Sequence, residues 1–314
     1  MLLSIKTGMI DRNIVEQAYC FFHQKWNVYA GKSSEKQRDD IEYAISCYAD
    51  TMSPELFRVI SAGKPDFLHD HSAFHTDMTA ALDLMSSYLE AGVLRYRLSP
   101  EVDAFSSLRD HDLPYPVTQA HQVHGVAIAK IDRPGVTREE LQGYDALITN
   151  VRGCAIGART ADCIPVLMYD PVNKAAAAVH SGWRGTVQRI SSVVVKEMAK
   201  TYGTDPENLI AVIGPGIGPD SFQVGPEVVN AFQYAGFCMD KIWEDRGEAL
   251  HDGSMRGGHH INLWEACRQT LVDAGVKPEN IQLPGICTYI SPDFYSARRE
   301  GLESGRIINT IKIL

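Results

Sequence analysis

Two short apolar runs on either side of a tight turn constrain the fold of this chain most strongly. The runs IPVLMYD and AAAAVH flank the turn sequence DPVN, in which Pro171 takes the second position. Runs of this length predict buried strands, and proline at that position favours a turn. Paired as a hairpin, the strands bring Cys163 and His180 to one end of a sheet. That end is either part of the core or a reactive site.

The spacing of apolar residues differs between two parts of the chain. Residues 11 to about 92 carry apolar side chains at helical spacing, which predicts an N-terminal helical region, residues 1–92, of unknown role. From Val93 onward, short strands are separated by turns and do not alternate regularly with helices. An α+β layered architecture therefore fits better than a doubly wound parallel sheet. Three helices are expected in this region. The first begins after Gly185 and ends at Gly203, the second begins at Pro226, and the third has Asn262 as its N-cap.

Charge and cysteine content exclude several classes of protein. The formal net charge is −9, which argues against a nucleic-acid-binding surface but leaves room for a small anion in a local basic pocket. Seven cysteines occur without a CxxC spacing, which is typical of reduced thiols. No stretch of about 20 apolar residues occurs, so we expect no membrane segment and a cytoplasmic location.

Three separate stretches supply residues that can bind a metal. They are HQVHG with His124, TADC with Cys163, and VHSGWRG with His180. Two imidazoles and a thiolate suit catalytic zinc, because a fourth position stays open for water whose pKa falls to about 7. Asp162 and His121 are candidates for orienting the ligands. Two alternatives stay open: simple core packing, and a metal-free pair in which His180 is the base and Cys163 the nucleophile.

Glycine-rich loops near these residues suggest substrate contacts. In SGWRG, Arg184 and the start of the following helix form a candidate phosphate site, although taken alone the motif is better explained by an ordinary strand-to-helix turn with a solvated arginine. In GPGIGPDSFQVG, Phe222 is a candidate for stacking on a flat ring or for the core. Arg298 and Arg299 are expected to be solvated or ion-paired, and HDGSMRGGHH is expected to be a flexible loop rather than a second metal site.

Ordered motifs from residue 93 to the C-terminus resemble the YfiH-like laccase-domain family. They are QVHG, DALIT, RTADCIPVLMYDP, AAVHSGWRGT, IGPGIG, FQVGPEV, CTY and SARREG. The resemblance implies a catalytic domain over residues 93–314, folded as a layered α/β/β/α sandwich like a toxin deamidase. By position, the family's metal ligands fall on His124, Cys163 and His180. A glycine-rich segment that usually precedes QxHG is missing here, and residues 1–92 match nothing recognisable.

The resemblance implies a zinc-dependent purine nucleoside phosphorylase that acts on adenosine, guanosine and inosine and has adenosine deaminase activity. Purine nucleoside and phosphate are then the ligands, Asp162 is the candidate acid/base, and Arg184 is a candidate phosphate contact. The family was first described as multicopper polyphenol oxidases, so a copper enzyme is one alternative. A metal-free Cys–His hydrolase or amidase acting on cell-wall precursors, and a non-catalytic binding module, are others.

Overall fold

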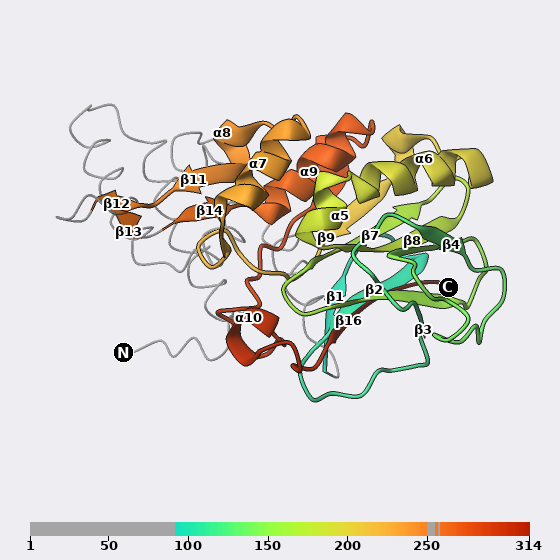
Figure 1. The fold of residues 1–314 in the computed structure, drawn as a ribbon. Coiled ribbons are helices and arrows are strands. Elements are labelled where there is room, and N and C mark those ends of the chain that lie inside the picture. The colour runs from blue at the N-terminus through green and yellow to red at the C-terminus, as the bar shows by residue number, and fades with distance from the viewer. Residues whose placement is uncertain (1–91, 250–254, 257) are drawn as a thin grey trace, which may run out of the picture. The chain divides into compact units, whose positions relative to one another are not determined.

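The computed structural model describes residues 92–249, 255–256 and 258–314 (Figure 1). The N-terminal helical region expected over residues 1–92 lies outside the described residues except for its last residue. The proposed division into 1–92 and 93–314 therefore stays a prediction.

A six-stranded mixed sheet contains the predicted hairpin. Its order is β15 (Ile281–Gln282), β9 (Ile210–Ile213), β7 (Ile164–Asp170), β8 (Ala175–Ser181), β5 (Ala146–Thr149) and β4 (Ile128–Lys130). The hairpin strands β7 and β8 pair antiparallel at its centre, and every residue in both is buried. Strands covered on both faces read as continuous apolar runs, which explains why these two stood out in the sequence.

A five-stranded sheet packs against one face of the six-stranded sheet (Figure 1). Its order is β1 (Val93–Tyr96), β2 (Val102–Ser107), β16 (Ile307–Ile313), β6 (Ala155–Thr160) and β3 (Thr118–Gln119). The chain leaves this sheet at the end of β6 and enters the other sheet at β7, with only residues 161–163 between them. This crossover fixes the position of Cys163.

Helices cover the other face of the six-stranded sheet (Figure 1). The main ones are α5 (Trp183–Val187), α6 (Ile190–Tyr202), α7 (Pro226–Tyr234) and α9 (Leu263–Asp273). The short elements are α8 (Met239–Ile242), α10 (Ala297–Glu300), η2 (Pro206–Asn208) and η3 (Pro278–Asn280). The layered α+β architecture predicted from the sequence is confirmed.

One predicted helix is divided in two. A single helix was expected to begin after Gly185, but α5 begins at Trp183 and a second helix, α6, begins at Ile190. Arg189 separates them with a left-handed backbone at φ 59°. Its side chain is held by an ion pair with Asp273 at 2.7 Å, so tertiary contacts stabilise a break that helix propensity does not reveal.

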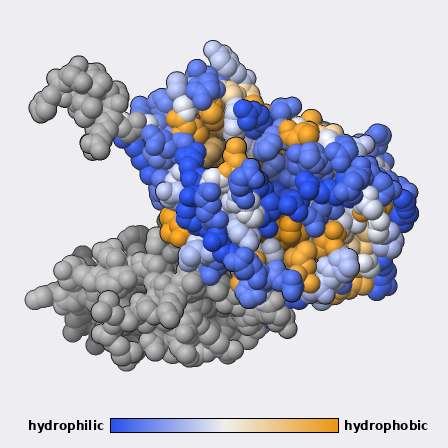
Figure 2. Space-filling view, turned by 60° about the horizontal axis from the view of Figure 1, so that its bottom comes forward, coloured by the Kyte–Doolittle hydropathy of each residue, from blue (hydrophilic) through white to orange (hydrophobic). Residues whose placement is uncertain are grey.

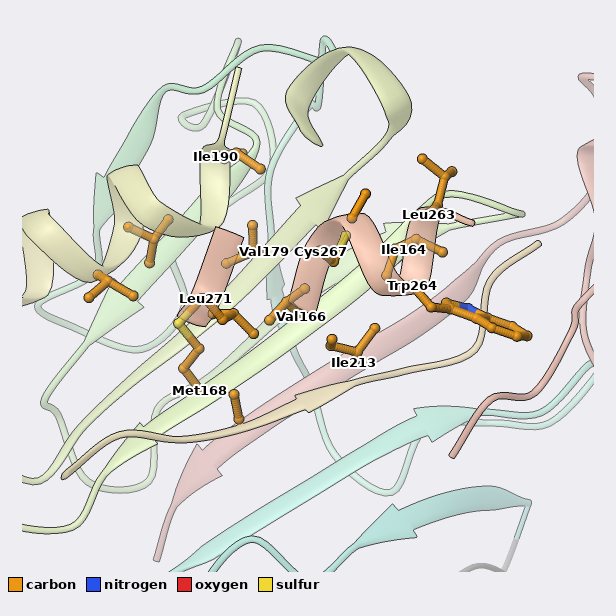
Figure 3. Close-up of a cluster of buried hydrophobic side chains, with 14 of the residues drawn as sticks. Ile164, Val166, Met168, Val179, Ile190, Ile213, Leu263, Trp264, Cys267 and Leu271 are labelled. Carbon is orange, nitrogen blue, oxygen red and sulfur yellow. The ribbon is translucent and has the colours of Figure 1, made fainter. Parts of the chain in front are cut away.

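The main core lies between the helices and the six-stranded sheet. Figure 3 shows Val166, Met168 and Val179 of the hairpin facing apolar side chains of α9, among them Leu271. Because strand side chains alternate between faces, the intervening buried residues of β7 and β8 face the five-stranded sheet instead. The predicted N-cap of α9 is confirmed, since the Asn262 side chain accepts a hydrogen bond from the Glu265 N–H at 3.0 Å.

The remaining strands are short. They are β10 (Gln223–Val224), β14 (His259–Ile261) and β11 (Trp243–Asp245) in one sheet, and β12 (Glu248–Ala249) with β13 (Met255–Arg256) in another. The segment expected to be a flexible loop therefore ends as strand β14, where His259 and His260 are paired in the sheet. On the face seen in Figure 2, hydrophobic residues form separate patches within a largely hydrophilic surface. In the part of the chain that the structure describes, no helix has the length and apolar character needed to cross a bilayer.

Candidate active site

The hairpin register brings Cys163 and His180 together as predicted. Pro165 lies opposite His180 and Ile164 opposite Ser181, so Cys163 stands beside the end of β8. The turn that follows Asp170 lies at the other end of the hairpin. The glycine after β8 is required for this approach. A Cβ on Gly182 would lie 2.8 Å from Cδ2 of His124 and 3.0 Å from Sγ of Cys163.

His124 joins this pair and completes a possible metal site. The ligand atoms of His124, Cys163 and His180 all lie within 4.8 Å of one another. Nε2 of His124 is 3.8 Å from Sγ of Cys163, and the two imidazole centroids are 4.8 Å apart. Tetrahedral zinc with bonds of about 2.0–2.3 Å sets its ligand atoms roughly 3.3–3.8 Å apart, so only a small contraction would close the set around an ion. Within the described residues, this is the one such group.

Asp145, directly before β5, positions two of these three residues. Its Oδ1 accepts a hydrogen bond from Nδ1 of His180 at 2.7 Å and from the N–H of His124 at 2.9 Å. Its Oδ2 accepts from the N–H groups of Val123 at 3.1 Å and Gly125 at 2.7 Å. This buried carboxylate therefore holds His124 at its left-handed φ of 62° and turns Nε2 of His180 toward the site.

Asp145, and not His121 as predicted, is the residue that orients the candidate ligands. His121 is exposed, and its Nδ1 lies 3.4 Å from the Arg138 guanidinium rather than beside the ligands. The motif DALIT contains Asp145, but its role is not evident from the sequence. Only the pairing of β5 with β8 brings the carboxylate next to His180.

Charge coupling shifts the pKa values at this site. Burial opposes ionisation of Cys163, but the charge of His180 and a hydrogen bond with His124 lower the thiol pKa to about 6. Burial likewise opposes protonation of His180, but the Cys163 thiolate and the Asp145 carboxylate raise its pKa to about 9. Although Asp145 is buried, hydrogen bonds from His180 and Gly125 lower its pKa. The metal-free site therefore favours a thiolate–imidazolium pair at neutral pH, and a thiolate is also the form that binds metal.

A cavity of about 530 Å³ opens onto the three residues. Its walls include the apolar side chains of Trp183, Ile217, Phe222 and Leu302. The charged residues of its lining are Arg138, Arg159, Asp162, Arg298 and Arg306. A volume of this size falls in the usual range for small-molecule sites.

Residues 105–314 match the family described as multi-copper polyphenol oxidoreductase laccase. The chain belongs to this laccase family. A purine nucleoside phosphorylase of Bacteroides thetaiotaomicron is 44% identical over 206 residues, which cover 64% of this chain and 73% of that protein. The adenosine deaminase RL5 of an unknown prokaryotic organism is 39% identical over 60% of this chain and 72% of that protein. The YfiH structure of Bacillus licheniformis shares the fold with a TM-score of 0.64 at 23% identity, covering 72% of this chain and 97% of that chain.

Asp162 lines the cavity of this laccase-family chain, but its side chain is already engaged. Oδ1 accepts a hydrogen bond from the Thr288 hydroxyl at 2.6 Å, and Oδ2 accepts from the N–H of Arg298 at 2.6 Å. Its carbonyl accepts from the N–H of Ile217 at 2.8 Å. Asp162 thus connects the crossover before Cys163 to two other segments. Its predicted role in proton transfer stays a prediction.

The structure separates the two predicted substrate residues. Phe222 lines the cavity and also belongs to the core, with the Arg298 guanidinium 5.7 Å from its ring centroid. Arg184 is exposed, does not line the cavity, and lies over the Trp183 ring at 4.3 Å. The helix beside it, α5, has only five residues. The predicted phosphate contact by Arg184 stays a prediction.

The arginine pair near the C-terminus is largely structural, as predicted. Arg299 forms an ion pair with Glu300 at 2.6 Å and donates to backbone carbonyls, including that of Thr288 at 2.7 Å. The Arg298 guanidinium donates to the carbonyls of Ser221 and Gln223.

Proposed function

We propose that this chain is a zinc-dependent purine nucleoside phosphorylase that acts on adenosine, guanosine and inosine and also deaminates adenosine. The observation that carries the proposal is the convergence of His124, Cys163 and His180 at the wall of a cavity of about 530 Å³. The names of the two relatives reported above supply the two reactions.

The donor set fits zinc. Two imidazole nitrogens and one thiolate are ligands that zinc prefers, and three protein ligands are typical of catalytic zinc sites. When bound, zinc supplies Lewis acidity and lowers the pKa of water. Asp145 fixes the tautomer of His180, because a proton on Nδ1 leaves the lone pair of Nε2 free for the ion.

The two proposed reactions differ in the nucleophile. In phosphorolysis, a phosphate oxygen forms a bond to C1′ of the ribose while the bond from C1′ to N9 breaks, which gives the free purine and ribose 1-phosphate. In deamination, water adds to C6 of adenine and ammonia leaves, which gives inosine. The apolar side chains of Phe222 and Trp183 suit a planar purine ring in both cases. Asp162, as the one carboxylate of the cavity lining, is the proposed residue for moving protons.

The test is a product analysis on the full-length, zinc-loaded protein. Adenosine is supplied with and without inorganic phosphate, and adenine, ribose 1-phosphate and inosine are quantified by chromatography. We expect adenine and ribose 1-phosphate only with phosphate. Inosine should accumulate without phosphate, and with phosphate it should be converted further to hypoxanthine. Cys163→Ala should abolish the products, whereas Cys238→Ala, at an exposed cysteine, should not. The proposal fails if neither product forms, or if Cys163→Ala behaves like the wild type.

A metal-free cysteine hydrolase is the second candidate, because His180 lies between Cys163 and Asp145. This order matches a nucleophile, a base and a carboxylate that orients the base. A chelator separates the candidates, since it abolishes the activity of a zinc enzyme and leaves that of a cysteine hydrolase intact. The copper alternative predicts copper rather than zinc in metal analysis of protein produced without added copper.

A further inference from the structure

The cavity is basic although the chain is acidic. Four arginines and a single carboxylate line it, whereas the formal net charge of the whole chain is −9. The carboxylate of Asp162 accepts hydrogen bonds with both oxygens. Arg298 differs from the other three arginines because its guanidinium lies over the Phe222 ring, 5.7 Å from the ring centroid. This leaves Arg138, Arg159 and Arg306, which we call the arginine cluster.

No member of the arginine cluster forms an ion pair with any residue in the described ranges. Arg159 donates to Oε1 of Gln119 at 3.0 Å. Arg138 donates to the Ala120 carbonyl at 3.4 Å and lies 3.4 Å from Nδ1 of His121. Arg306 donates to backbone carbonyls, among them that of Leu302 at 3.0 Å, and to the Ser304 hydroxyl at 3.2 Å. None of these partners is a carboxylate, so three guanidinium groups line one cavity without an ion-pair partner among the described residues.

The charges also repel one another. The pKa of Arg159 is lowered by its burial and by the charges of Arg138 and Arg306. A bound anion would relieve this repulsion, because a guanidinium binds phosphate oxygens with two parallel N–H groups.

One member of the arginine cluster, Arg159, is connected to the segments of two metal ligands. Arg159 lies near the end of β6, four positions before Cys163 and next to the crossover. The side chain of Gln122 donates to the Arg159 carbonyl at 2.8 Å and accepts from its N–H at 2.7 Å. Gln122 is two positions from His124, so a single amide ties the loop of one metal ligand to the strand that carries Arg159.

We propose that Arg138, Arg159 and Arg306 bind the phosphate that attacks C1′ in phosphorolysis. This inference rests on the proposed function. It also predicts that the two reactions respond differently to loss of these arginines, because deamination consumes water and requires no anion. Removal of one arginine should therefore weaken phosphate use alone. A charge-assisted hydrogen bond to phosphate corresponds to about ten- to hundredfold in affinity.

The experiment compares Arg138→Gln, Arg159→Gln and Arg306→Gln with Arg133→Gln in the full-length, zinc-loaded protein. Arg133 is a matched control because it is exposed, does not line the cavity and pairs with Glu140 at 2.9 Å. The KM for phosphate is measured at saturating inosine, the KM for inosine at saturating phosphate, and the deamination rate with adenosine alone. Zinc content confirms that each variant keeps its metal site.

We expect the KM for phosphate to rise about ten- to hundredfold in each variant of the cluster and not in the control. The KM for inosine and the deamination rate should stay within about twofold of the wild type. An unchanged KM for phosphate in Arg138→Gln and Arg306→Gln would overturn the inference and leave the proposed function intact.

Direct binding distinguishes failure of the proposed function. Calorimetry with inorganic phosphate alone needs no turnover. If the wild type shows no phosphorolysis but binds phosphate, and the cluster variants lose that binding, the phosphorylase assignment is wrong and the anion site is correct. If the wild type binds no phosphate and catalyses no phosphorolysis, both are wrong.

Discussion

Replacement of Asp145 by asparagine tests whether one buried carboxylate organises the metal centre. The change keeps the shape of the side chain but removes its charge and turns one acceptor oxygen into an NH2 donor. If the NH2 group takes the place of Oδ1, it meets the N–H of His124 and reverses the bond to Nδ1 of His180. If it takes the place of Oδ2, it meets the N–H groups of Val123 and Gly125. Either orientation leaves donors facing donors in a buried site.

The expected magnitude follows from these four hydrogen bonds. Reversal of the bond to His180 moves its proton to Nε2 and removes the lone pair that a metal requires. Loss of a partner that orients a metal ligand costs about ten- to hundredfold in metal affinity, or about 1.4–2.7 kcal/mol. Unpaired buried donors add about 1–3 kcal/mol of destabilisation for each group. We therefore expect Asp145→Asn to bind zinc at least tenfold more weakly and to unfold at a lower temperature.

The assay is a zinc competition titration against a chromophoric chelator, accompanied by thermal unfolding of the zinc-free protein. Asp170→Asn is the matched control. Asp170 is equally buried and accepts hydrogen bonds from the N–H groups of Val172 and Asn173. It lies at the turn end of the β7–β8 hairpin, opposite the end that carries His180. It should lower stability without changing zinc affinity. Wild-type zinc affinity in a folded Asp145→Asn protein would refute the reasoning.

Three further outcomes are expected. Gly182→Ala should weaken zinc binding about tenfold or more, because the added methyl group would crowd both His124 and Cys163. The same titration measures this, and unchanged zinc affinity would contradict the close approach of Gly182 to these two side chains. In zinc-free protein, the rate of Cys163 alkylation by iodoacetamide should rise with a midpoint at pH about 6, because the lowered pKa makes Cys163 a thiolate above that pH. A midpoint near the ordinary thiol pKa of about 8.5 would contradict the coupling to His180. The KM for phosphate should increase with ionic strength while the KM for inosine stays constant, in steady-state assays from low to high salt; parallel increases would argue against an electrostatic phosphate site.

The hairpin and the approach of Cys163 to His180 were predictable because their signals are local. Continuous apolar runs around a proline turn specify two buried strands, and antiparallel pairing then fixes which ends meet. Cys163 and His180 therefore could be placed at one edge before the structure was known, and the register confirms it. The addition of His124 depended on the known chemistry of zinc ligands and on the resemblance to a family.

The remaining features depend on contacts between distant parts of the chain. Asp145 acts on His180 only because β5 pairs with β8, 35 positions away, and no local pattern encodes that register. In the sequence, Arg159 has the pattern of an ordinary strand residue. In the structure, it lines the cavity next to the crossover, where the Gln122 amide bonds to its backbone. Arg184 stands in a conspicuous motif and yet lies over Trp183, outside the cavity. A conspicuous motif therefore does not by itself show which arginines line the cavity.

On the proposed function, the crossover between the sheets brings the residues for reaction with water and with phosphate to one cavity. His180 comes from the six-stranded sheet and Cys163 from the crossover itself, whereas Arg159 comes from the five-stranded sheet. Arg306 directly precedes β16 of the same five-stranded sheet, whereas Arg138 lies between β4 and β5 of the six-stranded sheet. On the proposed function, a nucleoside held near the metal reacts with water without the arginine cluster, whereas its reaction with phosphate requires the charges of that cluster. On the proposed scheme, loss of the arginine cluster turns a phosphorylase with deaminase activity into a deaminase, while loss of His180 removes both activities.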